Sequence, residues 1–153
     1  MILIAGIGNV FFGDDGFGVQ VAYLMSRTPP PDATVADYGI RAVHLAFELM
    51  TPYDACIVVD CMPRGGAPGT LYVVEPELDG SRAALPDAHG IDLSNVLDTV
   101  RELGGKVPPI LIVGCEPATI SPGMQLSAPV AAAVPGAADL VRELVANHPW
   151  RSS

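Results

Sequence analysis

The sequence has few basic residues and little charge overall. Its 153 residues include eight Lys and Arg against 17 Asp and Glu, so the formal net charge is −9, and only 16% of the residues are charged. An acidic surface repels phosphate groups, which argues against nucleic acid and anionic membranes as partners. A cationic ligand or a basic segment of a partner protein suits such a surface better.

Cysteines, long apolar runs and targeting signals are also scarce. The three cysteines, Cys56, Cys61 and Cys115, lack C-x-x-C spacing and lie in or beside apolar runs, which favours a structural role. No apolar stretch approaches the ~20 residues that span a bilayer. No basic region precedes the apolar start at Met1, so no signal peptide is expected. The sequence predicts a soluble cytoplasmic protein with one domain over residues 1–153.

Apolar residues, by contrast, are abundant. They make up half of the chain, and the mean hydropathy is +0.39. A chain of this composition can bury enough apolar surface to fold, which excludes a disordered protein. The 16 glycines and 15 prolines are scattered without a period, which excludes a collagen-like chain or a flexible linker.

Short β-rich runs alternate with helical patterns along the chain. The predicted strands are residues 1–5, 55–60, 70–74 and 110–114, with 33–38 as a weaker fifth, and the predicted helices are 16–26, 43–50, 93–103 and 129–147. Three strands are continuously apolar, as in parallel sheets covered on both faces. We therefore expect an α/β fold of three layers, with a central twisted, mostly parallel sheet flanked by helices. Pro135 should kink or break the last helix, and residues 75–90 are predicted to form a long loop.

The first predicted strand ends in a glycine-rich turn with the sequence GIGNVFFGDDGFG. A dinucleotide fingerprint would need glycine where Phe11 stands. The spacing from Gly8 to Gly13 matches a phosphate-binding loop, but Asp14 and Asp15 occupy the positions of its Lys and Ser or Thr. Two carboxylates would repel a triphosphate, so nucleotide binding is disfavoured.

Four residues remain as candidates for chemistry. Adjacent side chains cannot face the same way, so of Asp14 and Asp15 one should cap the following helix and the other should project into a cleft. Asp60 ends an apolar run and is expected to be solvated at the carboxyl edge of the sheet, where α/β folds bind ligands. His89 lies in the long loop. Ordinary turn or surface roles are the alternatives, but two carboxylates and an imidazole together suit zinc or nickel with an open coordination position.

Short motifs follow one another in order over residues 1–145. They are Gly6-Ile-Gly8-Asn9, Asp14-Asp15-Gly16-x-Gly18-Val19, Val59-Asp60, Pro68-Gly69-Thr70, His89-Gly90-Ile91-x-Leu93 with Val96-Leu97, Gly114-x-Glu116-Pro117 and Leu126-Ser127-x-Pro129. In this combination the sequence resembles the hydrogenase maturation endopeptidases, which process the large subunit of nickel–iron hydrogenases. It departs from many members at residues 37–41, DYGIR, where they have Asp-Gly-Gly-Thr, and at Ala88, which replaces a common Ser or Thr. These differences concern the hydrogenase that is served rather than the class of reaction.

The resemblance implies that Asp15, Asp60 and His89 form a metal-binding and catalytic trio exposed at the cleft. It implies removal of a short C-terminal extension from the large-subunit precursor once nickel is installed, with the nickel carried by the substrate rather than retained by the protease. Either a metal-bound water of lowered pKa or a polarised scissile carbonyl would then serve hydrolysis. No Gly-x-Ser-x-Gly motif is present, and Cys61 has no obvious paired base.

Two other hypotheses stay open on the sequence alone. The same three residues would serve a non-catalytic nickel-binding checkpoint or metallochaperone, which would bind the precursor without cleaving it. A different α/β hydrolase acting on small molecules would instead show broad hydrolysis. The sequence also leaves open the partner hydrogenase and the oligomeric state.

Overall fold

A five-stranded sheet forms the centre of the structure, a computed structural model in which residues 1–76 and 91–147 are described. Its strands are β1 (Ile2–Ile7), β2 (Ala33–Gly39), β3 (Ala55–Cys61), β4 (Leu71–Val74) and β5 (Ile110–Cys115). They lie in the order β2-β1-β3-β5-β4. The pairs β2–β1, β1–β3 and β3–β5 are parallel, and β4 is antiparallel to β5. The five predicted strands and the mostly parallel sheet are therefore confirmed.

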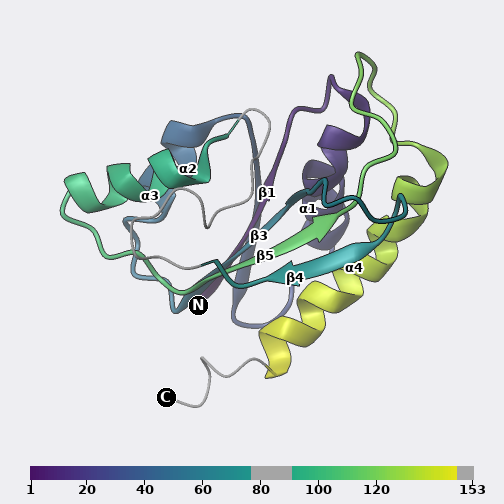
Figure 1. The fold of residues 1–153 in the computed structure, drawn as a ribbon. Coiled ribbons are helices and arrows are strands. Elements are labelled where there is room, and N and C mark those ends of the chain that lie inside the picture. Colours follow the sequence, from purple (N-terminus) through teal and green to yellow (C-terminus); the bar gives the residue numbers. More distant parts are fainter. Residues whose placement is uncertain (77–90, 148–153) are drawn as a thin grey trace.

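Helices cover both faces of the sheet (Figure 1). Helices α1 (Phe17–Ser26) and α4 (Ala128–Asn147) lie on one face, and α2 (Ala42–Glu48) and α3 (Leu93–Glu102) lie on the other. The predicted three-layer α/β fold is thus confirmed. Within the described part of the chain, no helix has both the length and the apolarity needed to cross a membrane.

The central strands are buried along their whole length, and their side chains alternate between two cores. Leu3 of β1 and Val58 of β3 pack in the core beneath α2 and α3. Their chain neighbours Ile4 and Ile57 point to the opposite face and pack in the core beneath α1 and α4. Apolar residues are therefore needed at nearly every position of β1, β3 and β5, which explains the long apolar runs in the sequence.

Helix α4 continues through Pro135, so of the predicted kink or break the break is wrong. A proline inside a helix removes one N–H donor and crowds the preceding turn. The buried residues of α4, which include Val130, Ala137, Val141 and Val145, recur along one face and pack in the core beside α1. Burial of this face outweighs the local cost of the proline.

The three cysteines lie inside β3 and β5 as free, buried thiols. Burial raises the pKa of Cys56 to about 12. Burial and the negative charges of Asp14 and Glu116 together raise the pKa of Cys115 to about 12. Thiols with such pKa values stay protonated at neutral pH, which agrees with the predicted structural role.

Candidate active site at the carboxyl edge of the sheet

Two glycines let the start of α1 approach the ends of β1 and β3 very closely. A Cβ atom on Gly18 would lie 2.0 Å from the carbonyl oxygen of Val59 and 2.4 Å from that of Ile7. A Cβ atom on Gly6 would lie 2.3 Å from the carbonyl oxygen of Gly18. No larger residue fits without a shift of the backbone. The carboxyl edge of the sheet and the beginning of α1 are consequently in direct contact.

The short 3₁₀ helix η1 (Gly13–Gly16) leads into α1 and carries Asp15. The Asp15 carboxylate accepts a hydrogen bond of 2.8 Å from the amide of Asn9. Gly8 has φ +128°, a conformation open to glycine, and a Cβ atom there would lie 2.0 Å from the Asp15 carbonyl oxygen and 3.3 Å from Asp60 Oδ1. Gly8 therefore lies between the two acidic residues and lets them come together.

Asp60 lies near the end of β3, and its Oδ1 accepts a 2.8 Å hydrogen bond from the amide of Cys61. Burial raises the pKa of the Asp60 carboxyl well above its usual range, and the negative charge of Asp15 raises it further. The hydrogen bond from the Cys61 amide lowers this pKa, but by less. The structure thus brings two of the predicted site residues, Asp15 and Asp60, into one electrostatically coupled pair.

The expectation that these carboxylates are exposed and solvated is wrong. Asp15 is 1% exposed and Asp60 is 4% exposed. They are buried because the glycine contacts at Gly6, Gly8 and Gly18 draw the turn, the helix and the strand ends together. His89, the third predicted ligand, lies outside the described residues, so its place in the site stays a prediction.

Asp14 does not cap α1, contrary to the expectation that one of the two acids would do so. Its buried carboxylate accepts four hydrogen bonds, from the amides of Ala118 (2.8 Å), Thr119 (3.0 Å) and Ser127 (2.7 Å) and from the Ser127 hydroxyl (2.8 Å). Burial would raise the pKa of Asp14, but these hydrogen bonds outweigh burial and lower it. Asp14 therefore ties the turn after β1 to the loop after β5.

Glu116 has a similar structural role that sequence reasoning did not find, although it lies in one of the motifs. It accepts hydrogen bonds from the amides of Arg64 (2.8 Å) and Gly66 (2.8 Å) and from the Tyr72 hydroxyl (2.7 Å). Burial acts to raise the pKa of Glu116, and these hydrogen bonds reverse the shift and lower it. Glu116 therefore holds the segment after β3 against the end of β5. The Arg64 guanidinium also lies 5.8 Å from the centre of the Tyr72 ring.

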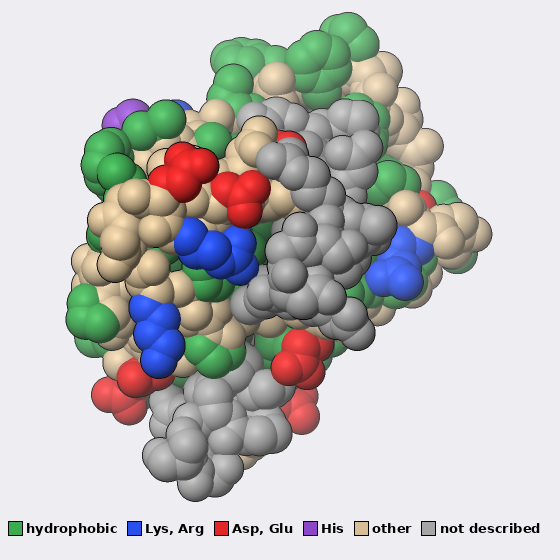
Figure 2. Space-filling view, turned by 60° about the vertical axis from the view of Figure 1, so that its left-hand side comes forward, with side chains coloured by type: hydrophobic (Ala, Val, Ile, Leu, Met, Phe, Trp, Pro, Cys, Tyr) green, Lys and Arg blue, Asp and Glu red, His purple; other side chains and the backbone are tan. Residues whose placement is uncertain are grey.

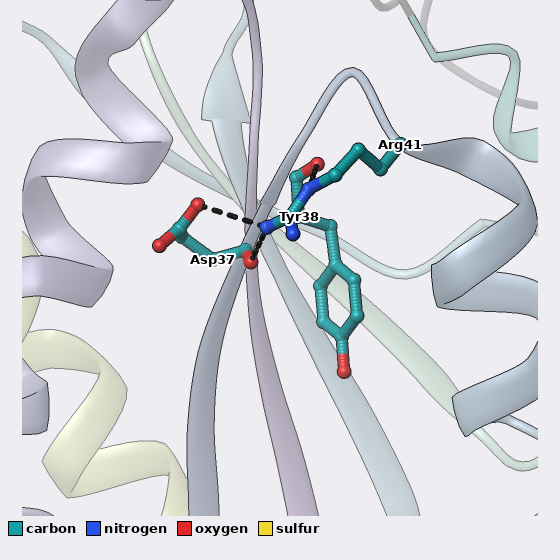
Figure 3. A network of polar contacts seen from close by, with 3 residues as sticks. All are labelled: Asp37, Tyr38 and Arg41. Atoms are coloured by element: carbon teal, nitrogen blue, oxygen red, sulfur yellow. Dashed lines mark hydrogen bonds and ion pairs between the residues drawn. The ribbon is translucent and has the colours of Figure 1, made fainter.

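Residues 37–41, where the sequence departs from the family pattern, border the site. The carbonyl oxygen of Gly39 accepts a 2.9 Å hydrogen bond from the amide of Gly8. Figure 3 shows the Arg41 guanidinium folded back over this turn, where it donates to the carbonyl (2.6 Å) and the carboxylate (3.3 Å) of Asp37 and to the Tyr38 carbonyl (3.0 Å). Arg41 thus closes the turn at the end of β2.

The chemistry of the carboxylate pair fits a divalent cation. Carboxylate oxygens are ligands of divalent metals, and a cation would relieve the repulsion between Asp15 and Asp60 that raises the pKa of Asp60. Residues 1–76 and 91–147 contain no group of three His, Cys, Asp or Glu side chains placed to hold a metal. The described residues would therefore offer a cation two carboxylates, those of Asp15 and Asp60.

Comparison with known proteins identifies the family. Residues 19–144 match the HycI family model, described as hydrogenase maturation protease. The hydrogenase expression/formation protein HupD of Rhizobium leguminosarum bv. viciae is 30% identical over 143 residues, which are 89% of this chain and 69% of HupD.

Solved structures agree with the sequence matches. The hydrogenase maturating endopeptidase HybD from E. coli has a TM-score of 0.78 and 26% identity, over 95% of this chain and 90% of HybD. The hydrogenase 2 maturation peptidase from a Thaumarchaeota archaeon has a TM-score of 0.74 and 32% identity, over 95% of this chain and 97% of that protein. The family match covers most of the chain, and these structures share its fold. The chain therefore belongs to the hydrogenase maturation protease family.

Proposed function

We propose that this protein is an endopeptidase that removes the C-terminal extension from the large-subunit precursor of a nickel–iron hydrogenase. In this proposal Asp15, Asp60 and His89 recognise the nickel that the precursor carries. Membership of the maturation protease family supports the processing reaction. The observation that carries the nickel hypothesis is the coupled pair of buried carboxylates at the carboxyl edge of the sheet.

The carboxylate pair would make cleavage depend on metal loading. Without a cation, Asp15 and Asp60 repel each other in a site of low exposure. A precursor that presents nickel relieves this repulsion, whereas an empty precursor does not. In this proposal the binding energy gained from the nickel-loaded precursor lowers the barrier to cleavage of the scissile bond.

The chain's own residues have limited roles in the hydrolysis itself. Asp15 and Asp60 would orient the substrate's nickel, and the nickel would either polarise the scissile carbonyl or lower the pKa of a bound water. Cys61 is a poor nucleophile, because burial and the negative charges of Asp60 and Asp15 raise its pKa and disfavour the thiolate. A metal-assisted reaction therefore suits this site better than covalent catalysis by a thiol.

A nickel-binding checkpoint without catalysis is the second candidate. It is favoured by the same observation, since two buried carboxylates could bind a metal-bearing precursor without cutting it. Under this alternative the protein would bind the loaded precursor and leave its mass unchanged.

Intact mass of the large-subunit precursor separates these possibilities. The purified precursor, nickel-loaded and nickel-free, is incubated with the wild type or with Asp15→Asn, Asp60→Asn or His89→Ala. Asp139→Ala, which removes an exposed carboxylate on α4, is the matched control. We expect the wild type and the control to release a C-terminal peptide from the loaded form only, and the site variants to lose almost all activity.

Other outcomes count against parts of the proposal. Equal cleavage of both precursor forms would refute the nickel gate but keep the protease. Binding of the loaded form without any loss of mass would favour the checkpoint. Normal processing by one of the three variants would remove that residue from the site.

A further inference from the structure

Two loops at the carboxyl end of the sheet expose large apolar side chains. Phe11 and Phe12, in the turn after β1, are 60% and 41% exposed, and Met124, in the loop after β5, is 67% exposed. We call these three residues the apolar patch. Figure 2 shows hydrophobic side chains gathered at the top of the molecule, the end at which both loops stand in Figure 1. Exposed apolar groups of this size that lie together are typical of binding surfaces.

Main-chain hydrogen bonds join the two loops. The amide of Gly13 donates to the carbonyl of Gly123, and the amide of Gly123 donates to the carbonyl of Phe11, both at 2.8 Å. Phe12 and Gly123 also form an isolated parallel bridge. The four hydrogen bonds to Asp14 fix the loop after β5 to the same turn. The main chain that carries the patch is therefore ordered before any partner binds, which lowers the entropic cost of binding.

The patch is continuous with the candidate active site. The amide of Phe11 donates to Asn9 Oδ1 at 2.9 Å, and the amide of Asn9 donates to Asp15 Oδ2 at 2.8 Å. The amide of Asp15 in turn donates to the carbonyl of Phe12 at 3.2 Å. The turn that positions Asp15 therefore also positions the two phenylalanines. The two phenylalanines of the patch and Asp15 are thus carried by one short turn.

The absence of charged side chains in the two loops favours an apolar binding partner. Residues 9–13 and 119–124 contain no charged side chain, although the chain has 17 Asp and Glu. Burial of apolar surface favours association, and aromatic side chains are frequent anchors at interfaces. An apolar segment gains from such a surface, whereas a charged segment does not.

We propose that the apolar patch binds an apolar segment of the hydrogenase large-subunit precursor close to the bond that is cleaved. This inference rests on the proposed function for the identity of the partner. It adds a docking surface of Phe11, Phe12 and Met124, which supplies affinity, to the carboxylate pair, which recognises the metal.

The test compares a variant of the patch with a matched control. Phe11→Ser/Phe12→Ser removes both aromatic rings, and Leu103→Ser removes a side chain that is 50% exposed at the end of α3, away from the patch. Affinity for the purified nickel-free precursor is measured by calorimetry, and KM and kcat are measured with the nickel-loaded precursor. We expect the double variant to lose about tenfold or more in affinity and to raise KM, with kcat changed little. Leu103→Ser should match the wild type.

The binding measurement keeps this inference separate from the proposed function. If the wild type binds the precursor through the patch but cleaves neither form, the endopeptidase proposal fails and the docking surface stands. Equal affinity of the double variant and the wild type, or no precursor binding by the wild type, overturns the docking surface.

Sedimentation and a second variant cover two further outcomes. If the wild type is a dimer, the double variant is a monomer and precursor binding is unchanged, the patch belongs to an interface between two copies of this chain and the inference is overturned.

If circular dichroism shows that the double variant is unfolded, Met124→Ser is used under the same criteria, because the Met124 side chain is 67% exposed.

Discussion

Gly18→Ala tests the close contact on which the site depends. In a helix without close neighbours, alanine in place of glycine gains up to ~1 kcal/mol. At Gly18, however, the new Cβ would lie 2.0 and 2.4 Å from two main-chain carbonyl oxygens, of Val59 and Ile7. Overpacking of this kind costs about 1–3 kcal/mol, and backbone atoms cannot rotate away, so the upper end applies. The net expectation is a loss of about 2 kcal/mol.

Gly136→Ala is the matched control, since it makes the same chemical change inside another helix. A Cβ atom at Gly136 would lie 3.7 Å from Leu71 Cδ1, an ordinary contact, so this variant should gain ~0.5–1 kcal/mol. Urea unfolding of both variants gives the free energies. At about 2–4 °C per kcal/mol for a domain of this size, the melting temperature of Gly18→Ala should fall by about 4–8 °C, while that of Gly136→Ala should rise slightly. A Gly18→Ala protein as stable as the wild type would refute the close contact of α1 with β1 and β3.

Three further predictions concern the buried carboxylates. Asp14→Ala should cost about 3 kcal/mol or more in urea unfolding, because it leaves the amides and the hydroxyl that bond to Asp14 without their acceptor. Asp60→Asn should abolish processing yet leave the free energy of unfolding equal to or higher than that of the wild type in chelator-treated buffer, because burial and Asp15 both disfavour the ionised carboxylate; a less stable variant would contradict this. Glu116 has a lowered pKa in the folded protein, so its carboxylate contributes stability above its ordinary pKa near 4.5, and this contribution is lost as the pH falls through the lower folded value. Unfolding of the wild type and of Glu116→Gln should therefore differ at pH 7 and converge in acid, and a difference that does not change with pH would contradict this.

Much of the fold could be predicted because local sequence and burial agree. The runs that became β1, β3 and β5 are almost entirely apolar, and both of their faces are buried. The position of Asp60 could be predicted for the same reason, since a carboxylate that follows such a run lies at the carboxyl edge of the sheet. The break at Pro135 was wrong, because helix packing over the whole of α4 outweighed a local rule.

The burial of the site could not be predicted, because it depends on contacts between distant parts of the chain. Asp14 is bonded to residues more than 100 positions away, so its role as a tie between two loops leaves no local signal and the expected helix cap was wrong. Likewise, the glycines Gly6 and Gly18 are conspicuous in the sequence, but only the packed structure shows that they face each other across a strand and a helix. The sequence therefore predicted that Asp15 and Asp60 lie at the same edge of the sheet, but it did not predict that they are buried.

The glycine contacts fix the carboxylate pair in place, whereas the side chains of the apolar patch can be substituted. The Asp15–Asp60 pair depends on Gly8 and Gly18, where any side chain would collide with main-chain atoms, so its position is tied to the central layers of the fold. The side chains of Phe11 and Met124 project from joined loops into solvent, so they can be exchanged at little cost in folding stability. If the apolar patch binds the precursor, selectivity for one precursor can change at the patch while the carboxylate pair stays in place. Exchange of the patch side chains should then alter which precursor is bound and leave the nickel requirement unchanged.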